Sequence, residues 1–139
     1  MIDAKLPIGV FDSGMGGLTV LRALQAAMPG ESFIYLGDSA RLPYGNKTTE
    51  TVQEYALQAS AALVERGIKA LVIACNTASA AALPLLVKTY APLPVFGVIE
   101  PGAQAAASAA GGAAAQLTAG RYYLCSLPFY CYPFVPMVY

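Results

Sequence analysis

Four short apolar runs, separated by helical patterns, dominate the first part of the sequence. Uninterrupted apolar runs of this length are typical of strands that are buried on both faces of a parallel sheet. We expect strands at Ile8–Asp12, Phe33–Gly37, Leu71–Cys75 and Val95–Ile99. The sequence therefore predicts an α/β fold in which helices flank a parallel sheet, as in flavodoxin-like or Rossmann-like domains.

Helical periodicity fills the intervals at Leu18–Met28, Thr48–Arg66 and Ala78–Tyr90. Strands and helices that alternate in this way form right-handed βαβ units, and ligands of such sheets bind beyond the carboxyl ends of the strands. The segments DSGMGG, GDSARLPYG and CNTAS follow the first three runs. We expect the chemistry in these three loops.

Charge almost disappears near Glu100, which divides the chain into two unlike parts. We expect an α/β domain at residues 1–104 and an aberrant or disordered tail at 105–139. The tail is first rich in alanine and glycine and then in aromatics and proline. A helix within Ala103–Ala115 is expected to be marginal, because it lacks large apolar residues. Its apolar end is not expected to span a membrane, because three prolines interrupt it.

Composition excludes several classes of function. Eight basic residues balance eight acidic ones, which argues against nucleic acid or an anionic membrane as a partner and favours a small molecule. The chain has no histidine, and its three cysteines form no C-x-x-C pair, so a Cys/His zinc site is excluded. The N-terminus does not resemble a signal peptide, and we expect a cytoplasmic protein.

Cys75 is the candidate for acid/base chemistry. It ends an apolar run, and Asn76, Thr77 and Ser79 offer caps for the helix that follows. A thiol at a helix N-terminus is favoured as thiolate, the form that can accept a proton. Spacing alone favours the alternative, a buried cysteine that acts as a small hydrophobe.

The two glycine-containing loops admit several interpretations. Asp12 and Ser13 precede a glycine turn that could present amides to an anion, but an aspartate there suits a substrate ammonium better than a phosphate. Either residue could instead only cap the next helix. In the second loop, Tyr44 and the amide of Gly45 are available to a ligand. Arg41 could bind an anion, although a pair with Asp38 or solvent is the commoner outcome.

Four segments carry a family resemblance: IGVFDSGMGGLTV, FIYLGDSARLPYG, ALVIACNTASA and VFGVIEPG. In order and spacing they resemble the N-terminal half of the glutamate racemases, in the aspartate/glutamate racemase superfamily. The DSG-GGLTV and LPYG segments are particular to the glutamate enzymes. The chain is therefore expected to be one half of a two-domain racemase.

The resemblance implies racemisation of L- and D-glutamate by two cysteines, without pyridoxal phosphate or metal, to supply D-glutamate for peptidoglycan. By this resemblance Cys75 is one acid/base. Asp12 and Ser13 contact the substrate's amino end. Its carboxylates are held by Tyr44-Gly45 and Asn76-Thr77. In the full-length family a homodimer is also expected.

The sequence departs from the family at the second cysteine, which stands in a Cys-Thr-His motif of a second domain. No segment here resembles that motif, and the chain has no histidine. We expect a truncated chain that is inactive alone, with residues from about Ala107 arising from out-of-frame or aberrantly spliced readthrough. Two alternatives stay open: a non-enzymatic fragment or amino-acid-binding module, and a related racemase of aspartate or a hydantoin.

Overall fold

The computed structural model describes residues 3–109, with side chains as far as residue 105. All strands run parallel in the order β2-β1-β3-β4. The strands are β1 (Ile8–Asp12), β2 (Phe33–Gly37), β3 (Ala70–Ile73) and β4 (Val95–Gly97). The helices are α1 (Gly17–Ala27), α2 (Thr49–Val64), α3 (Asn76–Tyr90) and α4 (Ile99–Ala109), with a 3-10 turn η1 (Tyr44–Asn46). The predicted α/β fold with a parallel sheet is confirmed.

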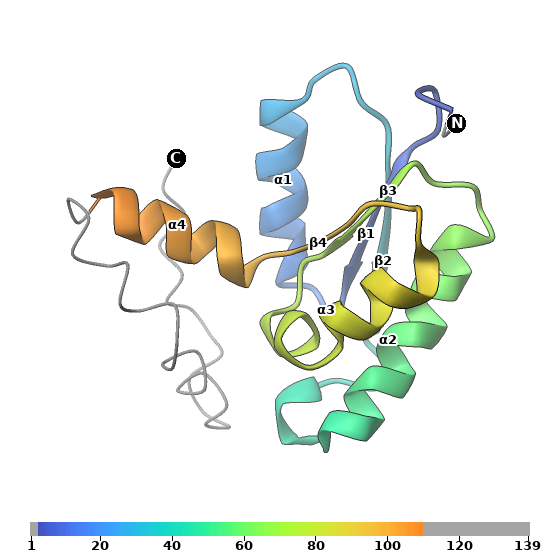
Figure 1. Ribbon diagram of the computed structural model, residues 1–139, viewed down its shortest axis with the longest axis vertical. Helices are drawn as coiled ribbons and strands as arrows, with labels where there is room; N and C mark the ends of the chain where they lie inside the picture. Colours follow the sequence, from blue (N-terminus) through green and yellow to red (C-terminus); the bar gives the residue numbers. More distant parts are fainter. Residues whose placement is uncertain (1–2, 110–139) are drawn as a thin grey trace.

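The sheet separates two apolar layers, with α1 on one face and α2 and α3 on the other (Figure 1). On the α1 face, inward side chains of the sheet pack against those of the helix and of the residue that follows it: Ile8, Val10, Val72 and Ala74 against Val20, Leu21, Leu24 and Met28. On the opposite face the core is larger and includes Phe11, Leu71, Ile73, Val52, Ala56, Leu63, Ala82 and Leu86. Residues of each strand alternate between the two layers, as the pleat requires.

Hydrogen bonds between α2 and α3 fix the larger layer. Gln53 Nε2 donates to the carbonyl of Ala81 at 2.9 Å, and the hydroxyl of Tyr90 donates to the carbonyl of Leu57 at 3.1 Å. Helix α2 begins after Thr48, whose hydroxyl accepts the amide of Thr51 at 3.3 Å. These contacts fix α2 and α3, the helices that follow the second and third of the predicted loops.

Two predicted strand ends were wrong. β3 ends at Ile73, before Cys75, and β4 ends at Gly97. The amide of Val98 donates to Ser79 Oγ at 3.3 Å, so it does not continue the ladder, and α4 begins at Ile99. No helix within residues 3–109 has the length and apolar character that crossing a membrane requires.

Helix α4 crosses the predicted boundary between residues 104 and 105. The alanine-rich stretch is helical as far as Ala109, and Figure 1 shows α4 leading away from the sheet. That boundary stays a prediction. Residues 110–139, which include most of the predicted tail and the proposed readthrough, lie outside the described residues.

Candidate active site

The loops after β1, β2 and β3 meet at one edge of the sheet. The amide of Asp38, just past β2, donates to the carbonyl of Asp12 at 2.9 Å. A Cβ atom on Gly37 would lie 2.3 Å from the carbonyl oxygen of Gly14, so the second loop packs directly against the first. The third loop joins through Cys75. The three segments expected to carry the chemistry are therefore neighbours.

Cys75 lies where the sheet gives way to α3. Its thiol donates to Ser13 Oγ at 3.2 Å, and its sulfur accepts the amide of Ala78 at 3.4 Å. The residue is 6% exposed. The sulfur thus lies at the N-terminus of a helix, the position expected from the sequence, where it accepts one amide and donates its own proton to Ser13 Oγ.

Asp12 closes the glycine turn between β1 and α1. Its Oδ2 accepts the amides of Gly14 at 3.1 Å and Gly17 at 2.9 Å, and Gly17 is the first residue of α1. The Asp12 carboxylate thus holds the first amide of α1, although the N-cap residue itself is Gly16, which has no side-chain cap. Whether Asp12 also contacts a substrate ammonium stays a prediction. Ser13, the next residue, accepts the thiol of Cys75 at its hydroxyl oxygen instead.

The cap of α3 differs from the prediction. Asn76, Thr77 and Ser79 were expected to offer caps, but the N-cap residue is Cys75 itself, through its sulfur. Ser79 Oγ donates to the carbonyl of Ile73 at 3.0 Å and joins β3 to the start of α4. Asn76 and Thr77 form the half-buried first turn of α3, and neither side chain caps the helix.

The side chain of Tyr44 is not available to a ligand, contrary to the prediction. It is 1% exposed, and its ring packs against Phe11 and Tyr55 with centroids 6.1 and 5.6 Å away. Its hydroxyl donates to Asp38 Oδ2 at 2.5 Å. Burial first, and then this hydrogen bond, raises the pKa of Tyr44 above its usual range, so the hydroxyl stays protonated.

Gly45 follows Tyr44, and its amide was also predicted to be available to a ligand. It is half-buried, and a Cβ atom built on it would lie 3.9 Å from Thr77 Oγ1. The turn η1 therefore lies beside the first turn of α3. Whether the amides of Gly45 and Thr77 bind a carboxylate stays a prediction.

Arg41 pairs within the protein. Its Nε lies 2.7 Å from Asp38 Oδ2, its Nη1 donates to Gln58 Oε1 at 2.5 Å, and its guanidinium carbon lies 4.4 Å from the centroid of the Tyr55 ring. The commoner outcome expected from the sequence, a pair with Asp38, is confirmed.

Sequence reasoning missed Tyr35. Its hydroxyl donates to the carbonyl of Gly14 at 3.0 Å and approaches Asp12 Oδ2 at 3.4 Å. The parallel register pairs Asp12 with Gly37, and residues two apart on a strand share a face. Tyr35 therefore faces the same side as Asp12, a signal that the pairing of the first two strands would have given.

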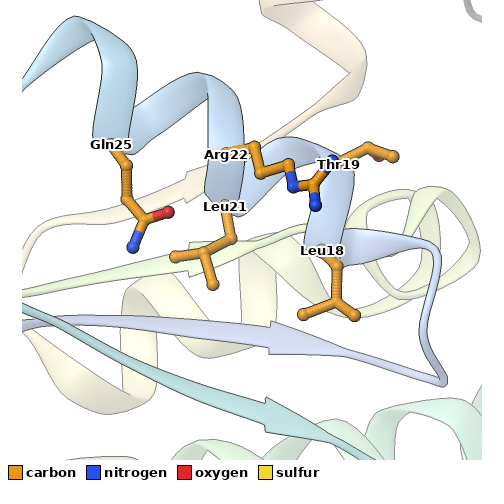
Figure 2. A pocket seen from close by; sticks show the side chains of 5 residues that line it. All are labelled: Leu18, Thr19, Leu21, Arg22 and Gln25. Atoms are coloured by element: carbon orange, nitrogen blue, oxygen red, sulfur yellow. The ribbon is translucent and has the colours of Figure 1, made fainter.

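Two hollows lie on the α1 side of the molecule. One runs along α1 and is lined by Leu18, Thr19, Leu21, Arg22 and Gln25 (Figure 2). The other is apolar and lies between α1, β4 and the start of α4, with Phe96 and Pro101 in its lining. Neither hollow contains Cys75. Within residues 3–109, no cluster of three His, Cys, Asp or Glu side chains is arranged to hold a metal ion.

Comparison with known proteins assigns this geometry to a family. The model of the Asp/Glu/Hydantoin racemase family matches residues 8–122, a span that includes all three loops. The chain belongs to the Asp/Glu/Hydantoin racemase family. Two of its relatives are the glutamate racemases of Thermus thermophilus, 56% identical over 106 residues, and Geobacter metallireducens, 58% identical over 101 residues.

Those alignments cover 76% and 73% of this chain but only 41% and 37% of the two relatives. The chain thus spans about two fifths of the length of the racemases it matches.

Solved structures of racemases in this family share the fold. The glutamate racemase of Thermus thermophilus in complex with β-chloro-D-alanine superposes with a TM-score of 0.71 at 56% identity, covering 75% of this chain and 40% of that one. The Francisella tularensis enzyme in complex with D-glutamate gives 0.70 at 44% identity, covering 73% and 38%. The family resemblance expected from the four sequence segments is confirmed.

Proposed function

We propose that this chain provides one half of the active site of a glutamate racemase, with Cys75 as one of two catalytic thiols. The contact that carries the proposal is the one between the sulfur of Cys75 and Ser13, beside Asp12 and at the N-terminus of α3. Relatives at 56–58% identity are glutamate racemases, which supports glutamate as the substrate.

The chemistry is proton exchange at the substrate Cα. A thiolate at Cys75 takes the Cα proton from one face, the electron pair delocalises into the α-carboxylate, and a second thiol returns a proton to the opposite face. The Cα–H beside a carboxylate is a weak acid, so the developing charge must be stabilised by hydrogen-bond donors. The proximity of Gly45 to Thr77 supports their amides as these donors. The contact of Ser13 with Cys75 supports Ser13 and the adjacent Asp12 as the residues that meet the ammonium group.

A second cysteine must come from outside this half. In the glutamate racemases that the chain resembles, the second cysteine belongs to a Cys-Thr-His motif, and these 139 residues contain no histidine. We expect the 139-residue chain alone to leave the configuration of glutamate unchanged. In the complete enzyme, the reaction needs no cofactor and supplies D-glutamate for peptidoglycan in the cytoplasm, with two copies forming a homodimer.

A chimera tests the role of Cys75. The segment of the Thermus thermophilus racemase that aligns with this chain is replaced by the segment from this chain, and conversion of D- to L-glutamate is followed by circular dichroism. We expect activity in the chimera and a loss of about 10²–10⁴-fold on Cys75→Ser, the range for a general acid/base. Val87→Ala, a change at an exposed residue of α3 outside the three loops, is the control. An active Cys75→Ser chimera would contradict the assignment.

Two other functions remain as alternatives. The family description includes aspartate and hydantoin substrates, and assaying the chimera with these compounds and with glutamate decides between the substrate classes. A non-enzymatic amino-acid-binding module would bind D-glutamate in calorimetry, but the chimera that contains it would not racemise any of these compounds, with or without Cys75→Ser.

A further inference from the structure

We propose that Asp38 is a positioning residue, which holds the turn Tyr44–Asn46 against the first turn of α3 through the hydroxyl of Tyr44. The consequence for substrate binding rests on the proposed function, because it assigns the amide of Gly45 to a carboxylate of glutamate.

Asp38 is fixed to the frame of the site before it contacts Tyr44. It follows β2 directly, is buried, and donates its amide to the carbonyl of Asp12 at 2.9 Å. Its backbone therefore moves with the end of β1, where Asp12 and Ser13 stand. The side chain of Asp38 therefore has a fixed position relative to the edge of the sheet, and so do the groups that bind to it.

One oxygen of Asp38 holds two groups. Oδ2 accepts the Tyr44 hydroxyl at 2.5 Å and lies 2.7 Å from Arg41 Nε. Arg41 in turn is held by Gln58 and by the ring of Tyr55, both on α2. Hydrogen bonds to an ionised acceptor are shorter and stronger than neutral ones, so this carboxylate is a firm anchor.

Tyr44 links Asp38 to the turn η1. Its ring is enclosed by Phe11 and Tyr55, and its carbonyl accepts the amide of Lys47 at 3.0 Å, which closes η1. Gly45 is the next residue and lies beside Thr77. The glycine has no side chain that could fix the turn itself, so its placement depends on the buried tyrosine before it.

The experiment compares two tyrosine-to-phenylalanine variants of the full chain. Tyr44→Phe removes the hydroxyl that donates to Asp38 and keeps the ring. Tyr90→Phe is the matched control, since it also removes one tyrosine hydrogen bond, to Leu57, between α2 and α3. Exchange of the Lys47 amide with solvent, measured by NMR, reports on the closure of η1.

We expect Tyr44→Phe to speed Lys47 exchange about tenfold, the equivalent of one lost hydrogen bond, and Tyr90→Phe to change it less than about twofold. Asp38→Ala should act like Tyr44→Phe. Asp38→Asn keeps an oxygen that can accept the hydroxyl and should restore most of the protection. Equal exchange in the Tyr44→Phe variant and the wild type overturns the proposal.

Titration with D-glutamate, followed at the amides of Gly45 and Thr77, tests the consequence for binding. Tyr44→Phe and Asp38→Ala should weaken binding about five- to tenfold, with Tyr90→Phe and Asp38→Asn within about threefold of the wild type. If Tyr44→Phe binds like the wild type, the positioning role is wrong. If the wild-type chain binds no glutamate, this half of the site does not bind the substrate alone; the chimera then decides the proposed function, and Lys47 exchange decides the role of Asp38.

Discussion

The sulfur of Cys75 and the hydroxyl of Ser13 lie 3.2 Å apart, although 62 positions separate the two residues in the sequence. The contact joins the loop after β3 to the loop after β1, whose strands are neighbours in the sheet. A hydroxyl can reverse its hydrogen bond and donate to the sulfur once the thiol has lost its proton. Ser13 is thus placed to stabilise a thiolate at Cys75.

Ser13→Ala should slow alkylation of Cys75 by iodoacetamide at pH 7 about three- to tenfold, because one charge-assisted donor to the thiolate is lost. The measurement is made with Cys125→Ser and Cys131→Ser, so that Cys75 is the one remaining thiol. Ser60→Ala, a change on α2, is the control and should leave the rate unchanged. An unaltered rate in Ser13→Ala would show that the hydroxyl does not act on the sulfur.

Gly37→Ala should lower the free energy of unfolding by about 2 kcal/mol or more, because its Cβ would lie 2.3 Å from the carbonyl oxygen of Gly14. That oxygen belongs to backbone, so relief requires the glycine turn beside Asp12 to move. Gly30→Ala is the matched control, since no atom lies within 4 Å of its Cβ, and it should change stability by less than about 1 kcal/mol. Urea unfolding of both variants makes the comparison, and equal midpoints would refute the close approach.

The strands and the approximate site could be predicted because both depend on local pattern. The runs Ile8–Asp12 and Phe33–Gly37 are observed with the predicted bounds, and polar residues follow the first three strands as expected. The carboxyl ends of parallel strands share one edge, which placed Ser13 and Cys75 at the same edge, and they contact each other because β1 and β3 are adjacent in the sheet.

The orientation of Tyr44 could not be predicted because it depends on partners from distant elements. A tyrosine between proline and glycine reads as an exposed loop residue, but Phe11 of β1 and Tyr55 of α2 enclose its ring. The cap of α3 failed for a related reason. Side-chain preference favours Asn, Ser or Thr at that position, whereas the end of β3 at Ile73 places Cys75 there instead.

Ser60→Ala should leave the free energy of unfolding unchanged or raise it by about 1 kcal/mol. Ser60 is fully buried within α2, and its hydroxyl has no hydrogen-bond partner among the residues that the structure describes. A buried unsatisfied hydroxyl costs about 1–3 kcal/mol, and alanine also has the higher helix propensity. Thermal or urea unfolding measures the change. A loss of more than about 1 kcal/mol would indicate that the hydroxyl is bonded in solution.

Stability should fall at alkaline pH through Tyr44. Its pKa is raised in the folded protein, first by burial and then by the hydrogen bond to Asp38. The contribution is therefore fully present below about pH 10, where an unfolded tyrosine keeps its proton, and is lost as the pH rises from there toward the folded-state pKa. One such group gives a slope of at most about 1.4 kcal/mol per pH unit. Tyr44→Phe should have lower stability at neutral pH but a flatter decline between pH 9.5 and 11.

Tyr90→Phe should flatten the decline less, because Tyr90 is less completely buried, although burial raises its pKa too. Urea unfolding at each pH measures both slopes, and a Tyr44→Phe variant that declines as steeply as the wild type would assign the alkaline loss to other groups.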